Sequence, residues 1–176
     1  MRDIMNEIEI KTAFKMGYIQ NFYREPAFRS IEQQFGIKRP EILVLIFLGF
    51  EDEVTAAEIV EFSGHLKTNI TRAVVDLEKK GFLRRRTDST DQRRQLLLIT
   101  SEGRRVRAEF MPMLQEREAW MLSALNRREC EQFEVLLNKL ARHTPNWTGR
   151  PQNLSPRRPP VRRSKSAIDG ATTPAR

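Results

Sequence analysis

The segment from residue 56 to 100 constrains the fold of this chain more than any other part of it. Thr55, followed three residues later by Glu58, has the form of a capping box, the arrangement that opens an α-helix. The helix that starts there is short, because Ser63 and Gly64 break the pattern. A second helix follows almost at once, so the order predicted for this region is helix, turn, helix.

The second helix is predicted from about Leu66 to Lys80, where Gly81 stops it. Its apolar residues recur at spacings of three and four: Ile70, Ala73, Val74 and Leu77. Short polar groups and cations occupy the other side: Lys67, Thr68, Asn69, Thr71 and Arg72. Such groups reach base edges and phosphates when a helix lies in the major groove of DNA, although on an isolated helix they also suit a plain solvated face.

A basic hairpin comes next. Two short runs, Phe82 to Arg86 and Gln95 to Ile99, have strand character, and a polar loop from Thr87 to Arg94 joins them. Five cations lie on this small element, opposed only by Asp88 and Asp91: Arg84, Arg85, Arg86, Arg93 and Arg94. Alone it would read as an ordinary solvated hairpin, but directly after a helix-turn-helix it is better interpreted as a wing that contacts DNA beside the groove.

Three strings in this region resemble the winged-helix domain of the MarR family of bacterial transcription regulators. They are Asn69-Ile70-Thr71-Arg72, Leu77-Glu78-Lys79-Lys80-Gly81-Phe82-Leu83, and Asp91-Gln92-Arg93-Arg94. The resemblance covers about residues 4 to 143. It implies a mainly α fold, a winged helix-turn-helix with a small β-hairpin wing, flanked by N- and C-terminal dimerisation helices. Leu66 departs from the family, which commonly has serine there, so Ser63, Lys67 or Thr68 is expected to cap the recognition helix instead.

The resemblance also assigns roles to residues. Arg93 is expected to insert at or near the minor groove, with Asp91 holding the arginines of the wing in place. The predicted contacts with double-stranded DNA are made by Lys67, Thr68, Asn69, Thr71, Arg72, Arg84, Arg86, Arg93 and Arg94. The partner is expected to be a pseudo-palindromic operator.

The flanking segments favour a homodimer. Phe14, Tyr18 and Phe22 recur every four residues before Pro26, which is expected to interrupt the helix. Residues 42–50 are almost wholly apolar and should be buried, and a long helix begins at Ser101. The terminal helices carry apolar stripes that a lone domain of this size would leave partly exposed. The expected division is a winged-helix lobe at about 38–100 with dimerisation helices at about 4–25 and 101–143, within a domain of residues 1–144.

A small aromatic or phenolic effector is a further hypothesis that the resemblance suggests. The aromatic residues that would line its pocket are Phe14, Tyr18, Phe22, Phe47 and Trp120. An ordinary aromatic core would use the same residues. If such an effector binds, the protein would be a repressor, and binding of the ligand would release it from DNA. The alternatives are a ligand-independent DNA-binding protein, or a winged-helix module that binds an acidic protein partner.

The remaining chain offers little for catalysis. Its two histidines, His65 and His143, are far apart in the sequence, and no cluster has metal-ligand spacing, so neither an enzyme nor a cofactor is expected. Cys130 is interpreted as a structural residue of an apolar stripe, with redox sensing as the alternative. A single cysteine and the absence of a long apolar run predict a cytoplasmic protein without a membrane span.

The last 32 residues differ in composition from the rest. From Pro145 onward, seven Lys or Arg residues face one Asp, so this tail carries most of the net charge of +8. Its Pro, Arg, Ser and Thr content predicts a disordered basic tail over residues 145–176. It is interpreted either as an arm that adds phosphate contacts or as a solubilising extension.

Overall fold

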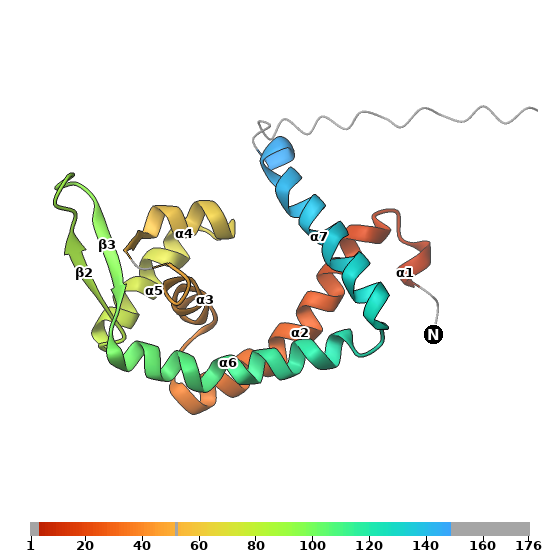
Figure 1. The fold of residues 1–176 in the computed structure, drawn as a ribbon, viewed down its shortest axis with the longest axis horizontal. Helices are drawn as coiled ribbons and strands as arrows, with labels where there is room; N and C mark the ends of the chain where they lie inside the picture. The colour runs from red at the N-terminus through yellow and green to blue at the C-terminus, as the bar shows by residue number, and fades with distance from the viewer. Residues whose placement is uncertain (1–3, 52, 149–176) are drawn as a thin grey trace, which may run out of the picture. The chain divides into compact units, whose positions relative to one another are not determined.

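The computed structural model describes residues 4–51 and 53–148. By its internal contacts the chain divides at Cys130 into two units. The helices are α1 (Ile4–Glu7), α2 (Lys11–Phe35), α3 (Arg39–Leu48), α4 (Ala56–Ser63), α5 (Lys67–Lys79), α6 (Ser101–Leu122) and α7 (Arg127–Thr148), and the strands are β1 (Val54–Thr55), β2 (Leu83–Thr87) and β3 (Gln95–Ile99) (Figure 1). The predicted fold class, a mainly α winged helix-turn-helix, is confirmed.

The helix-turn-helix forms as the local sequence signals predict. The backbone N–H of Thr55 donates to Glu58 Oε2 at 2.7 Å, and the backbone N–H of Glu58 donates to Thr55 Oγ1 at 3.2 Å, which completes the capping box of α4. Gly64 ends α4 with φ of 66°, a left-handed conformation that glycine adopts without steric cost. The recognition helix α5 differs from expectation at its start. Leu66 occupies the N-cap position, and no side chain caps the helix, so the predicted substitute caps are wrong.

The wing belongs to a three-stranded antiparallel sheet, not to a hairpin alone. The strand order is β1-β3-β2, with Val54 opposite Leu97 on one side of β3 and Arg85 opposite Leu97 on the other. Strand β1 was not predicted, because two residues are too short to show the alternation of a strand. Its pairing ties the wing strand β3 to the residues that lead into α4.

A single apolar core joins these elements within residues up to Cys130. It takes Ala27 and Ile31 from α2, and its other members come from the link at Ile37 and from α3, α4, α5, the sheet and α6: Ile42, Val44, Leu45, Leu48, Val54, Ile59, Ile70, Ala73, Val74, Leu77, Leu83, Leu97, Ile99, Val106, Phe110 and Leu114. The predicted burial of residues 42–50 holds only as far as Leu48, where α3 ends. Phe50 lies beyond the helix and is 82% exposed, because the turned chain no longer faces the core.

Helix α2 passes through Pro26 and ends at Gly36, so the predicted interruption at Pro26 is wrong. A proline inside a helix removes the N–H that would bond to the carbonyl four residues earlier, here that of Phe22. Arg117 of α6 supplies the missing donor: its Nη2 lies 2.6 Å from Phe22 O and its Nε 2.7 Å from Tyr23 O. A donor 95 positions away in the chain therefore allows the helix to continue.

Helix α6 packs closely against the base of the wing. Thr100 caps α6 by accepting the backbone N–H of Gly103 at 3.1 Å, and its hydroxyl donates to Gly81 O at 2.7 Å. A Cβ atom on Gly103 would lie 2.0 Å from Phe82 O, so a residue with a side chain would not fit without moving the backbone. The first turn of α6 is thus fixed against the exit of the recognition helix.

Helix α7 opens with a second capping box, in which Asn126 N–H donates to Glu129 Oε2 at 2.8 Å and Glu129 N–H donates to Asn126 Oδ1 at 3.0 Å. Cys130 is half-buried and its thiol lies 3.9 Å from Leu125 O. The helix runs to Thr148, so the boundary predicted at residue 144 falls inside it. The rest of the predicted tail, 149–176, lies outside the described residues. Several large apolar side chains of α7 are exposed: Phe133, Val135, Leu136, Leu137 and Leu140.

Candidate nucleic-acid interface

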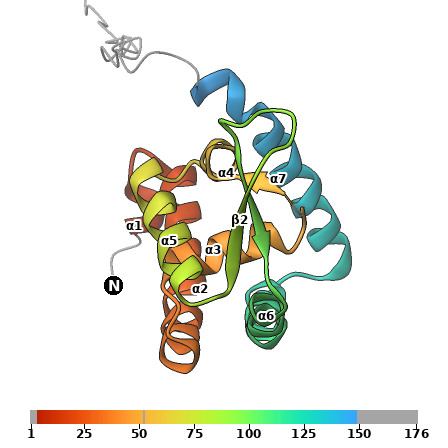
Figure 2. The ribbon, with the colours of Figure 1, turned by 90° about the vertical axis from the view of Figure 1, so that its left-hand side faces the viewer.

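The polar side of the recognition helix is open to solvent. Ile70, Ala73, Val74 and Leu77 face the core and hold α5 in place, so the rest of its first two turns points outward. All five polar residues singled out from the sequence are exposed: Lys67, Thr68, Asn69, Thr71 and Arg72. Figure 2 looks onto the side of the hairpin, where α5 and β2 run beside each other. The exposed polar residues of α5 and the wing therefore belong to the same lobe.

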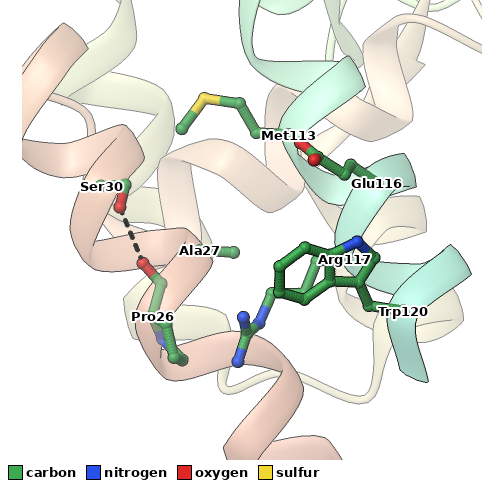
Figure 3. A pocket seen from close by; sticks show the side chains of 7 residues that line it. All are labelled: Pro26, Ala27, Ser30, Met113, Glu116, Arg117 and Trp120. Atoms are coloured by element: carbon green, nitrogen blue, oxygen red, sulfur yellow. Dashed lines mark hydrogen bonds between the residues drawn. The ribbon is translucent and has the colours of Figure 1, made fainter.

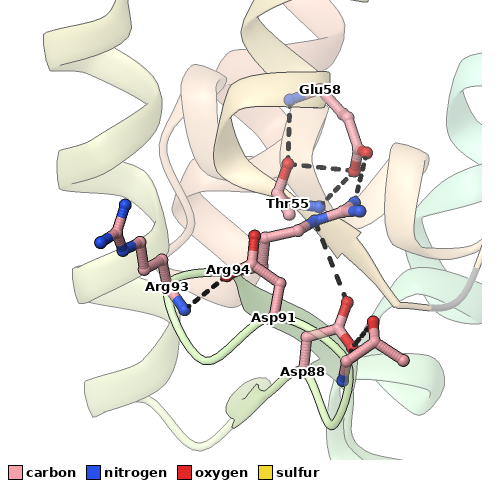
Figure 4. A network of polar contacts seen from close by, with 7 residues as sticks. Thr55, Glu58, Asp88, Asp91, Arg93 and Arg94 are labelled. Atoms are coloured by element: carbon pink, nitrogen blue, oxygen red, sulfur yellow. Dashed lines mark hydrogen bonds and ion pairs between the residues drawn. The ribbon is translucent and has the colours of Figure 1, made fainter.

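Arg94, a predicted DNA contact, forms ion pairs with two carboxylates of the protein. Its Nη2 lies 2.8 Å from Glu58 Oε1 and its Nε 4.0 Å from Asp88 Oδ2. Glu58 is the residue that completes the capping box of α4, so Arg94 connects the wing loop to the first helix of the helix-turn-helix (Figure 4). The guanidinium is half-exposed, and its geometry is that of a brace for the wing.

The remaining arginines of the wing differ in whether they form ion pairs within the protein. Arg86 Nη2 lies 2.6 Å from Glu53 Oε1, and Arg85 Nε lies 3.1 Å from Glu78 Oε2. Arg84 and Arg93 are exposed, and neither guanidinium makes an ion pair with any residue that the structure describes. These two side chains are therefore the cations of the wing that are free for an external anion.

Asp91 shapes the wing loop through the backbone. Its Oδ1 accepts the backbone N–H of Arg93 at 2.9 Å, and its carbonyl accepts the backbone N–H of Arg94 at 2.9 Å. Asp91 thus contacts the backbone of both arginines within the turn of the loop, and its expected role in holding the arginines of the wing in place stays a prediction. Asp88 forms an ion pair with Arg94. Its Oδ1 also accepts hydrogen bonds from the backbone N–H and the hydroxyl of Thr90, both at 2.8 Å.

The carboxylates of this network favour their charged forms. The pKa of Glu58 is lowered mainly by the hydrogen bond from the Thr55 backbone N–H, with smaller contributions from the Thr55 hydroxyl and the charge of Arg94, against the opposing effect of burial. The pKa of Asp88 is lowered mainly by the backbone N–H of Thr90 and then by its hydroxyl. Near neutral pH both carboxylates are ionised, as the brace on Arg94 requires.

The aromatic residues proposed as a ligand pocket do not all meet. Tyr18, Phe22 and Trp120 line a cavity of about 320 Å³ between α2 and α6, together with Ile19, Tyr23, Arg117 and Met121. Phe14 does not line it. Phe47 lies elsewhere, packed edge-on against Phe62 with ring centroids 5.0 Å apart. The spacing of four residues placed Phe14, Tyr18 and Phe22 on one face of a single helix. The cavity, however, is formed between α2 and a second helix, α6.

A neighbouring cavity of about 250 Å³ shares two of the same side chains. Arg117 and Trp120 line it together with Pro26, Ala27, Ser30, Met113 and Glu116 (Figure 3). Arg117 thus borders both cavities while its guanidinium donates to Phe22 and Tyr23. It was not identified from the sequence, because a lone arginine in a helix rich in charged residues carries no local signal.

Glu53 and Glu58 were also missed as parts of the wing. Each is separated from its arginine by more than thirty residues in the chain, and only the pairing of β1 with β3 places them beside it. Two other kinds of feature, a metal site and a membrane-spanning helix, are absent from the described part of the chain. No group of three His, Cys, Asp or Glu side chains there is placed to hold a metal ion. None of the described helices is long and apolar enough to cross a membrane.

A recognition helix open to solvent, followed by a sheet with a basic wing, defines the winged helix-turn-helix class of DNA-binding proteins. The family model that matches the chain is that of the MarR family, over residues 35–94. The HTH-type transcriptional regulator PapX of Escherichia coli is 34% identical over 113 residues, which cover 62% of this chain and 68% of PapX. The transcriptional repressor MprA of Escherichia coli K12 is 30% identical over 107 residues, 60% of this chain and 61% of MprA.

The fold agrees with these sequence matches. A MarR family regulator from Silicibacter pomeroyi has a solved structure that superimposes with a TM-score of 0.67 at 23% identity, covering 74% of this chain and 88% of the other. The chain belongs to the MarR family of transcriptional regulators. Members of this family are DNA-binding proteins and not enzymes.

Proposed function

We propose that the protein is a homodimeric, sequence-specific reader of double-stranded DNA that represses transcription. The observation that carries this proposal is a set of exposed polar and cationic side chains on α5 and on the wing. Asn69, Thr71 and Arg72 on α5 and the unpaired Arg84 and Arg93 on the wing are exposed together. Amide and guanidinium groups on a helix read base edges, and free cations beside it bind phosphates or the minor groove.

The free and the paired arginines take different roles in this proposal. Arg93, with Arg84, contacts the DNA backbone or minor groove, and Lys67, Thr68, Asn69, Thr71 and Arg72 make the contacts of α5. Arg94 and Arg86 act as braces, since their guanidinium groups are engaged by Glu58 and Glu53. This division moves two residues from the predicted DNA-binding set to the support of the wing.

A dimer supplies the second recognition helix. Two copies related by a twofold axis would insert their α5 helices into major grooves about 34–36 Å apart, which requires a pseudo-palindromic operator. Exposed apolar side chains of α2, including Ile19 and Phe22, support a surface that a second copy would cover, and those of α7 independently support another. Two lobes also double the number of free cations that face the DNA. A protein of this kind would act in the cytoplasm.

Repression and release by a ligand form the finer part of the proposal. MprA is named as a transcriptional repressor, which favours the same sign of regulation for this chain. The cavity of about 320 Å³ lined by Tyr18, Phe22 and Trp120 has the size and the aromatic walls that a small phenolic or aromatic compound would need. A ligand would act only if it binds one spacing of the two recognition helices better than another.

Fluorescence anisotropy on the DNA upstream of the protein's own gene tests the central claim. The native duplex is compared with a scrambled duplex over a range of salt concentrations. A regulator should prefer the native duplex by about a thousandfold or more near physiological salt. Equal affinity for both duplexes, lost as salt rises, would contradict sequence-specific reading. The same probe then serves to screen aromatic acids and phenols for release.

A further inference from the structure

Glu41 is unusual among the residues whose burial the structure describes, because it is the one charged side chain in the buried class, with 1% of its surface exposed. It lies in the first turn of α3. A buried carboxylate is costly unless hydrogen bonds and an opposite charge compensate it. The contacts of Glu41 therefore indicate what the fold gains by keeping a charge there.

Both carboxylate oxygens of Glu41 have partners, and the partners come from different helices. Oε2 accepts the backbone N–H of Lys38 at 2.5 Å, which closes the start of α3. Oε1 lies 2.6 Å from the Nζ of Lys80. The same ammonium group donates to the carbonyl oxygen of Gly36 at 2.7 Å. The Glu41 side chain is 2% exposed and that of Lys80 32%, so solvent reaches the pair only from the lysine side.

These contacts connect the ends of three helices at one point. Gly36 is the left-handed residue that ends α2, with φ of 65°, and Lys38 is the N-cap of α3. Lys80 is the C-cap of the recognition helix α5. One ammonium group therefore joins the end of α2, whose earlier turns carry Tyr18 and Phe22, to the end of the helix that faces DNA.

We propose that Lys80 and Glu41 are positioning residues that fix the angle of the recognition helix relative to α2. This inference rests on the proposed function, in which two copies present their α5 helices to one operator. Ala27 and Ile31 of α2 already pack in the core of the lobe, and the bond from Lys80 to Gly36 O adds a directional contact where α2 passes into the short link at residues 36–38. With the ion pair in place, the separation of the two recognition helices is set, and so is the spacing of half-sites that the dimer accepts.

The chemistry of the contact favours this role over simple packing. The hydrophobic effect is non-directional, so apolar burial alone specifies the angle between two helices less sharply than directional bonds do. Charge-assisted hydrogen bonds have narrow distances and angles, so they specify one arrangement of the helices that they join. A buried ion pair often adds little stability, because removing two charges from water is costly. Buried polar groups can instead serve to specify one arrangement of the elements that they join.

The test is the double variant Lys80→Met with Glu41→Gln, which removes both charges together. The glutamine retains an oxygen for the backbone N–H of Lys38, and methionine retains much of the length of the lysine stem. Neither change leaves a buried charge without a partner, as Lys80→Met alone would. Lys79→Met, an exposed neighbour at the end of the same helix, is the matched control.

The measurement is the ratio of affinities for operators whose half-sites are at the native spacing or one base pair closer or farther. One base pair changes the separation by about 3.4 Å and the rotation by roughly 35°. The wild type and Lys79→Met should prefer the native spacing by about tenfold or more, a factor within the usual range of coupling between sites. In the double variant this preference should fall to about twofold or less, while affinity for a single half-site stays unchanged.

The outcomes separate the inference from the proposed function. If the wild type binds no operator specifically, the proposed function fails. If the wild type distinguishes the spacings and the double variant distinguishes them equally well, the positioning role is overturned although the protein still reads DNA. A purely structural role would lower the midpoint of thermal unfolding and leave the ratio unchanged. The ratio is measured well below that midpoint, so partial unfolding does not enter it.

Discussion

The guanidinium of Arg117 replaces the hydrogen-bond donor that Pro26 cannot supply. Proline has no N–H, so the carbonyl of Phe22 loses its partner within α2, and Arg117 Nη2 of α6 lies 2.6 Å from that oxygen. The Nε of the same side chain donates to Tyr23 O at 2.7 Å. Two long helices are thus joined at the one point where the backbone of α2 has no donor of its own.

Substitution of Arg117 should therefore cost stability in a way that depends on Pro26. Arg117→Met leaves the Phe22 carbonyl without a donor and removes a second hydrogen bond to Tyr23 O, and it is expected to lower the free energy of unfolding by about 1–2 kcal/mol. Pro26→Ala restores an N–H at position 26, so the cost of Arg117→Met should be smaller in the Pro26→Ala background. A double-mutant cycle by urea denaturation measures the difference. Equal costs in both backgrounds would show that the two residues act independently.

Arg93 should contribute to DNA affinity without contributing to folding. Arg93→Met removes one free cation per subunit, so the slope of log affinity against log salt should fall by about 1 per subunit. The midpoint of thermal unfolding should stay unchanged because the guanidinium has no ion pair among the described residues. Arg29→Met, an exposed position on α2, removes the same charge away from the wing and serves as the control. An unchanged salt slope in Arg93→Met would remove this residue from the interface.

The pair of Arg94 and Glu58 should order the wing more than it stabilises the whole fold. Its side chains are 46% and 49% exposed, and exposed ion pairs contribute less than about 1 kcal/mol. Arg94→Met and Glu58→Gln are each expected to speed hydrogen exchange at the Asp88 amide, which bonds to Arg94 O at 3.0 Å. The double variant should exchange no faster than either single one. Glu109→Gln, which removes a carboxylate on α6, should leave this amide unaffected.

Acid should release the wing at a pH set by Glu58. Because its pKa is lowered in the fold, the stabilisation it provides is complete above the ordinary glutamate pKa of about 4.3 and is lost as pH falls through the lower folded value. The first cause is the Thr55 backbone N–H, so Arg94→Met should raise the pKa of Glu58 only in part. An NMR titration of the carboxyl carbon measures it. A complete return to the ordinary value in Arg94→Met would assign the shift to the arginine instead.

Residues of the recognition helix should affect which sequence is bound. Arg72→Ala and Asn69→Ala are each expected to cost about 1–3 kcal/mol on the native operator and to relax preference at one base pair of each half-site. The comparison requires a set of operators with single base changes, each titrated by anisotropy. Lys79→Ala, in the last turn of α5, should leave the preference unchanged. A uniform loss on all sequences would instead mean that the substituted side chain contacts phosphate.

Local signals in the sequence predicted the helix-turn-helix well. The capping box of Thr55 and Glu58 and the stops at Gly64 and Gly81 depend on residues a few positions apart, and each forms as expected. Leu66 is the exception, because its carbonyl begins the hydrogen bonds of α5 while no side chain caps the helix. The fold class followed from these signals together with the two strand-like runs of the wing.

The errors concern partners that are distant in the chain. Pro26 was expected to end its helix because the donor that rescues the helix, Arg117, is far along the sequence. The ion pair of Arg94 with Glu58 was not foreseen, because Glu58 is 36 residues away and lies close only after β1 pairs with β3. Composition marks a basic wing, but it does not distinguish a cation that is paired within the fold from one that is free.

Thr100 has a consequence for any attempt to give this protein a new target. It is the single residue between β3 and α6, and its hydroxyl spans both the glycine after α5 and the first turn of α6. An insertion or deletion at this junction would change the phase of α6 by about 100° per residue. The tip of the wing between Asp88 and Arg94, the two residues of the ion pair that leads to Glu58, carries no such constraint on the helices. Loops from other regulators can therefore be exchanged at the tip, whereas the base of the wing must be kept unchanged.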